Sequence, residues 1–155
     1  MQEKLLTDTE INYREIKEKI TEAAKSAGRD PEDIRLMAVT KTVAPEKINI
    51  AINSGCDLLG ENRVQEFLEK YESYDKNAEV HFIGSLQTNK VKYIVDKVSM
   101  IESVDSIKLA EEIEKRCEKI DKIMDILLEV NIANEENKGG FSPDEVVGIS
   151  EKIND

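Results

Sequence analysis

Lys41 is the residue of this chain whose type and position point most directly to chemistry. It follows residues 35–40, a short and mostly apolar run that is typical of a strand buried on both faces. A lysine at the end of such a strand can be partly desolvated, which lowers the pKa of its amine and frees it to attack a carbonyl group. The alternative is a solvated lysine at the rim of the protein, which is the commoner situation.

Three further polar residues occur in or after the next apolar runs. Asn62 follows the second run, where its amide could orient a ligand or cap the helix that comes next. His81 lies within the third run, and Ser85 belongs to the polar turn behind it. A lone strand histidine is more often a core residue with hydrogen-bond partners than a catalyst, so both interpretations of His81 stay open.

The fifth apolar run leads into a long polar segment that contains Asn131 and Lys138. Lys138 stands before Gly139 and Gly140, where it could meet an anion at the start of the next helix. A flexible, solvated loop is the alternative for this segment. No dinucleotide-binding glycine motif, phosphate-binding P-loop or nucleophile elbow is present in the sequence.

The elements that must position these residues alternate between strand and helix. Thr7 and Glu10 have the spacing of a capping box for a first helix that Gly28 ends, and Thr88 and Asp105 are the expected caps of two later helices. We expect strands at 35–40, 57–60, 80–84, 98–101 and 124–131, with helices at 45–53, 62–74, from 88, from 105 and at 142–154.

This alternation predicts a parallel α/β sheet in a single domain over residues 1–155. Two architectures fit: an open doubly wound sheet, for which five strands are complete, and a (β/α)₈ TIM-type barrel, for which five are not. In both, functional sites gather at the carboxyl ends of the strands.

Composition excludes several classes of partner and site. The 33 acidic and 22 basic residues give a net charge of −11, which argues against nucleic acids and anionic membranes as partners. Cys56, Cys117 and the single histidine cannot form a zinc set, and both cysteines are expected to be buried. With no signal peptide or membrane-spanning run visible, the expected compartment is the cytoplasm.

Taken together, the strand-end segments resemble the pyridoxal phosphate (PLP) homeostasis protein family, a relative of the alanine racemase N-terminal barrel. The matching segments are LMAVTKT (36–42), LGENRVQE (59–66), HFIGSLQTNK (81–90), IESVD (101–105), and LEVNI (128–132) with NKGG (137–140). The resemblance implies that Lys41 holds PLP as a Schiff base and that Asn62 lies beside the cofactor ring. It also implies that His81, Ser85 and Asn131 surround the barrel mouth, with Lys138 near it.

The resemblance further implies a non-catalytic protein that buffers or delivers PLP in vitamin B6 homeostasis, with PLP-requiring apo-enzymes as partners and a monomeric full-length form. The chain departs from the family at Val43, where a second lysine is frequent, and at Ser85, where proline is usual. It also lacks the family's C-terminal phosphate-binding segments. We therefore expect a shortened form of the barrel that binds PLP weakly and self-associates, because each lost charge-assisted hydrogen bond costs roughly 1.5–3 kcal/mol.

Two other functions remain as alternatives. One is a PLP-dependent amino-acid racemase, which pairs its lysine with a tyrosine from a second domain. The sequence disfavours it, because none of the tyrosines is expected in a strand-end loop; they are Tyr13, Tyr71, Tyr74 and Tyr93. The other is a flavodoxin-like interaction module that does not bind PLP.

Overall fold

The computed structural model describes residues 7–133, 135 and 139–154 as an α/β unit around one parallel sheet. The strands are β1 (Ala38–Val39), β2 (Leu58–Glu61), β3 (Glu79–Phe82), β4 (Met100–Val104) and β5 (Asp125–Leu128). They pair in the order β1-β2-β3-β4-β5, so every strand lies beside its neighbour in sequence. A doubly wound sheet reverses its strand order at a switch point, so this order fits consecutive strands of a barrel and excludes the open alternative.

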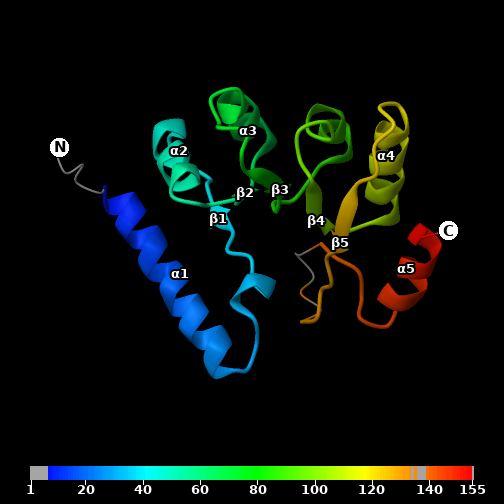
Figure 1. Ribbon diagram of the computed structural model, residues 1–155. Helices are drawn as coiled ribbons and strands as arrows, with labels where there is room; N and C mark the ends of the chain where they lie inside the picture. Colours follow the sequence, from blue (N-terminus) through cyan, green and yellow to red (C-terminus); the bar gives the residue numbers. More distant parts are fainter. Residues whose placement is uncertain (1–6, 134, 136–138, 155) are drawn as a thin grey trace, which may run out of the picture.

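The helices connect these strands. They are α1 (Asp8–Ser26), α2 (Pro45–Asn53), α3 (Val64–Tyr71), α4 (Ile107–Glu118) and α5 (Val146–Asn154), with the 3₁₀ helices η1 (Pro31–Asp33) and η2 (Thr88–Tyr93). Figure 1 shows α2, α3 and α4 in a row along the same side of the sheet. No helix among the described residues is long and apolar enough to cross a membrane.

The hydrophobic core lies between this row of helices and the outer face of the sheet. Leu59, Phe82 and Ile101 of the strands are completely buried there, as is Phe67 of α3. Side chains alternate between the two faces of a strand, so the neighbours of core residues point to the opposite, inner face. On that face Val39 of β1 is 49% exposed and Leu127 of β5 50%, so the inner face is open to solvent at the two outer strands.

The structure confirms several local predictions. Thr7 and Glu10 form the reciprocal capping box of α1, and α2 has the predicted bounds. Cys56 and Cys117 are free and buried, and burial raises the pKa of both thiols.

Several boundary and cap predictions are wrong. The first and fifth strands and the third and last helices are shorter than predicted. The fourth strand begins two residues later than predicted and extends to Val104. The cap of α4 is Ser106, whose hydroxyl accepts the Leu109 N–H, while Asp105 accepts a hydrogen bond from that same serine. The helix expected to be capped by Thr88 is a six-residue 3₁₀ segment without a side-chain cap. Polar residues occur in pairs at these turns, and sequence spacing alone does not identify which of them caps.

Candidate cofactor site at the carboxyl ends of the strands

Lys41 and Asn62 occupy corresponding places at the carboxyl ends of β1 and β2. Val39 is paired in register with Gly60, and the ladder continues because Thr40 N–H donates to the Gly60 carbonyl at 3.0 Å. The two residues predicted to contact the cofactor therefore follow the carboxyl ends of two neighbouring strands.

Lys41 lies in a tight turn. Val43 N–H donates to the Thr40 carbonyl at 3.1 Å, which makes Lys41 and Thr42 the central residues of a four-residue turn. Thr42 has φ +61°, a left-handed conformation that glycine or asparagine usually adopts at this turn position. For a β-branched residue such a conformation costs on the order of 1–3 kcal/mol, and it persists only where the surroundings impose it.

Lys41 is exposed, and among the described residues no group forms a hydrogen bond or ion pair with its ammonium. Of the two interpretations of Lys41, the structure therefore shows the solvated lysine at the rim and not the partly desolvated amine. The physical reason is the exposed inner face of the sheet at β1, since desolvation needs a second layer of atoms above the amine.

A buried polar cluster lies on the outer side of the same turn. Glu61 is completely buried, and its Oε1 accepts hydrogen bonds from Thr40 Oγ1 (2.6 Å) and from the Tyr74 hydroxyl. The Lys70 ammonium stands 3.2 Å from the same oxygen, which places a compensating charge beside the carboxylate. Desolvation and the neighbouring Glu61 raise the pKa of Tyr74, so its phenol stays protonated.

The cluster contacts the backbone on both sides of Lys41. Lys70 Nζ donates to the Thr40 carbonyl at 3.0 Å, and Thr42 N–H donates to Glu66 Oε1. Glu66 and Lys70 are themselves paired at 2.8 Å, one turn apart on α3. The hydrogen bonds from Lys70 and from Thr42 N–H lower the pKa of Glu66, which keeps the carboxylate ionised.

Asn62 packs against Gly84 of the next strand end. A Cβ at residue 84 would overlap both the backbone carbonyl oxygen and the side-chain amide oxygen of Asn62, so only glycine fits there. Asn62 does not cap α3, whose first flanking residue is Arg63 without a side-chain cap hydrogen bond. The capping interpretation of Asn62 is therefore wrong.

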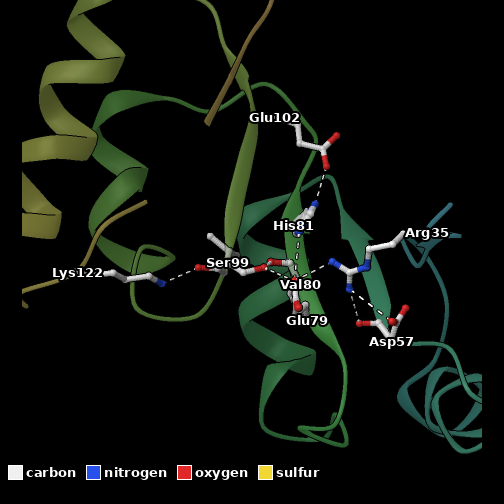
Figure 2. Close-up of polar contacts among 9 residues, drawn as sticks. Arg35, Asp57, Glu79, Val80, His81, Ser99, Glu102 and Lys122 are labelled. Carbon is white, nitrogen blue, oxygen red and sulfur yellow. Dashed lines mark hydrogen bonds and ion pairs between the residues drawn. The ribbon is translucent and has the colours of Figure 1, made fainter. Parts of the chain in front are cut away.

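His81 lies deeper in the sheet than Lys41. It pairs in register with Gly60 and Met100, which places it on the inner face, and it is 7% exposed. Figure 2 shows its ring between two carboxylates: Nδ1 is 2.6 Å from Glu102, and Nε2 is 3.7 Å from Glu79. His81 therefore has its own partners below the mouth, whereas Ser85 is exposed in the loop after β3.

A charged cluster closes the opposite, amino-terminal end of the sheet. The Arg35 guanidinium lies between Glu79 (3.2 Å) and Asp57 (3.7 Å) in Figure 2, so it joins the starts of three strands. Its hydrogen bond lowers the pKa of Glu79. In barrels this end serves stability rather than chemistry, so we exclude it from the candidate site.

Asn131 begins the loop after β5. Its side-chain amide forms two hydrogen bonds with the backbone of Glu135: Nδ2 donates to the carbonyl at 3.0 Å, and Oδ1 accepts from the N–H at 3.1 Å. The chain then returns beside it, since Asn131 N–H donates to the Phe141 carbonyl at 2.9 Å. Asn131 thus connects Glu135 and Phe141 to the segment after β5. Lys138 lies outside the described residues.

The buried cluster behind Lys41 was not predicted from the sequence. Glu66 and Lys70 have the i,i+4 spacing of a helical ion pair, which was the available signal. The sequence contains no such signal for Glu61, because a glutamate is expected at the surface unless its buried partners are known.

The alanine racemase N-terminal domain model matches residues 11–155. The chain belongs to this family. Among curated proteins, the family relative from Aquifex aeolicus named pyridoxal phosphate homeostasis protein is 48% identical over 135 residues, which cover 86% of this chain and 59% of the relative. The protein of the same name from Pasteurella multocida is 33% identical over 147 residues, covering 93% and 63%. The chain thus spans about 60% of the length of these relatives.

Several solved structures are similar to this chain in fold. A crystal structure of an unknown protein from Bifidobacterium adolescentis matches with TM-score 0.86 and 33% identity, over 97% of this chain and 68% of that one. PipY of Synechococcus elongatus with PLP bound matches with TM-score 0.71 and 26% identity, over 86% and 63%. Alanine racemase of Streptomyces coelicolor, at 17% identity and TM-score 0.63, shares the fold. The chain therefore has the α/β fold of the racemase N-terminal barrel.

Proposed function

We propose that this chain is the PLP-holding part of a homeostasis protein and that Lys41 carries the cofactor. The observation that carries the proposal is the exposed Lys41 amine, presented by a strained turn after β1, with Asn62 after the neighbouring strand β2. The PLP homeostasis proteins to which the chain is similar, and the PLP-bound PipY structure, support the choice of cofactor.

The residues around Lys41 fit such a group. Met37 and Ile83 meet above Gly60, where a Cβ would lie 2.6 Å from the Met37 sulfur and 3.1 Å from Ile83 Cδ1. These side chains would offer apolar contacts to a flat ring, and Asn62 would offer an amide that can form hydrogen bonds with it. PLP supplies an aldehyde that condenses reversibly with a primary amine, which is the chemistry a carrier needs to store and release it.

Within this proposal the protein acts as a carrier and not as an enzyme. A racemase needs a second acid or base opposite its lysine. Of the described tyrosines, Tyr74 is buried with its hydroxyl on Glu61, and the Tyr13 hydroxyl donates to the Gly55 carbonyl at 2.9 Å, so both serve the framework. PLP-requiring apo-enzymes as recipients and the cytoplasm as compartment remain predictions from the sequence.

The test is covalent trapping. The chain is mixed with PLP, reduced with borohydride and digested, and the modified lysine is identified by mass spectrometry. We expect modification at Lys41 and its loss in Lys41→Ala, while Lys47→Ala on the adjacent helix α2 behaves like the unsubstituted chain. A digest in which Lys41 stays unmodified while other lysines react would contradict the proposal. A racemase assay of the same samples separates the carrier from an enzyme, because appreciable turnover would reverse that choice.

A further inference from the structure

Two side chains of α3 contact the backbone immediately before and after Lys41. Lys70 Nζ donates to the carbonyl of Thr40 at 3.0 Å, and Glu66 Oε1 accepts the N–H of Thr42. Neither touches the Lys41 side chain. Their effect on Lys41 therefore acts through the peptide groups on either side of it.

These contacts account for the unusual conformation of the turn. Thr42 has φ +61°, and its N–H is directed at Glu66 rather than at solvent. A left-handed threonine without such a partner would relax to an ordinary conformation, because nothing in its own side chain favours this one. Relaxation would rotate the adjoining peptide and redirect Lys41.

The pair is itself held in place. Lys70 is 9% exposed and contacts Glu61, a carboxylate with no exposed surface that also accepts the Thr40 hydroxyl. The turn is thus connected through Lys70 to the buried end of β2, and through Glu66 to the first turns of α3. Because packed interiors resist deformation, these buried side chains fix the position of the turn relative to β2 and α3.

We propose that Glu66 and Lys70 are positioning residues that hold residues 40–42 so that the Lys41 amine faces the cofactor side of the sheet. The identity of that cofactor rests on the proposed function above, whereas the clamp on the turn rests on the described contacts alone.

The experiment compares Glu66→Ala and Glu66→Gln with Glu69→Ala. Glu69 is an exposed carboxylate on the same helix that accepts a hydrogen bond from Gln65, so it is the matched control. Two quantities are measured on folded protein: hydrogen exchange of the Thr42 amide by NMR, and the initial rate at which PLP and borohydride modify Lys41. Thermal melts establish that each variant is folded.

We expect Glu66→Ala to accelerate Thr42 exchange and to slow Lys41 modification by about tenfold or more, because small errors of position have large effects on bond formation. Glu66→Gln keeps an oxygen acceptor for the Thr42 N–H, so its Thr42 exchange rate and its Lys41 modification rate should lie close to those of the unsubstituted chain. If Glu66→Ala does not fold, the comparison of Glu66→Gln with Glu66→Leu, which lacks the acceptor, decides. Glu69→Ala should match the unsubstituted chain.

The possible outcomes separate the clamp from the proposed function. Unchanged Lys41 modification in folded Glu66→Ala, or equal effects of Glu66→Ala and Glu69→Ala, overturns the inference and leaves the proposed function standing. If the unsubstituted chain is not modified at Lys41, the proposed function and the cofactor part of the inference fail together. Thr42 exchange then still decides whether the clamp exists.

Discussion

Replacing Lys70 by methionine tests the buried cluster on which the turn depends. The substitution keeps an apolar stem but removes an ammonium that contacts Glu66 (2.8 Å), Thr40 O (3.0 Å) and Glu61 (3.2 Å). The Glu61 side chain has no exposed surface, and that of Lys70 is 11% exposed. Breaking one side of such a pair leaves an uncompensated buried charge, so we expect a loss of about 3–5 kcal/mol in the free energy of unfolding.

The assay is urea unfolding followed by circular dichroism, arranged as a double-mutant cycle. Glu61→Gln combined with Lys70→Met removes both charges, so it should recover a large part of the loss seen in Lys70→Met alone. The control is Lys97→Met, which breaks the ion pair between Lys97 (24% exposed) and Asp96 (52% exposed). Loss of this solvent-exposed pair should lower the free energy of unfolding by no more than about 1 kcal/mol. A Lys70→Met loss below about 1 kcal/mol would refute the reasoning.

Three other predictions follow from the same contacts. Gly84→Ala should destabilise the chain by roughly 2 kcal/mol or more, because its Cβ would overlap Asn62. Gly148→Ala in helix α5 should be neutral or stabilising, because a Cβ there would meet no atom of another part of the described chain within 4 Å; equal effects in thermal melts would contradict this. The pKa of Glu66 lies below its ordinary value of 4.5, so the stability it contributes is complete above that pH and is lost as the pH falls through the folded-state pKa. The difference in unfolding free energy between the unsubstituted chain and Glu66→Gln should therefore shrink on acidification, and a difference that stays constant down to about pH 3 would argue against it. Titration of the 155-residue chain by absorbance should show weak binding of PLP with little advantage over pyridoxal, because phosphate sites of barrels lie after the seventh and eighth strands and the described residues form five strands; micromolar, phosphate-specific affinity would contradict this.

The sequence predicts the frame of the fold well, because the strands are apolar runs and the helices carry strong local signals. The capping box at Thr7 and Glu10 and the proline that opens α2 identify helix starts through local hydrogen bonding and fixed backbone geometry. The strand order could not be derived from periodicity, since alternating strands and helices fit both a barrel and a doubly wound sheet. Pairing between strands, a long-range property, was needed to decide it.

The candidate site was predicted unevenly for a similar reason. Lys41 and Asn62 were predicted because strand ends are visible in the sequence, and the structure places them after the neighbouring strands β1 and β2. The roles of Glu61 and Lys70 could not be found, because their importance comes from burial against one another across three elements. The sequence left the exposure of Lys41 open between a solvated and a partly desolvated amine, since the cover of a strand end depends on what packs above it.

Identification of the lysine that PLP modifies is the decisive experiment for the proposed site. After borohydride reduction and digestion of the 155-residue chain, we predict that the modified peptide contains Lys41 and that Lys41→Ala abolishes this modification. Preferential modification of another lysine, with Lys41 unmodified in a folded sample, would contradict the assignment of the site.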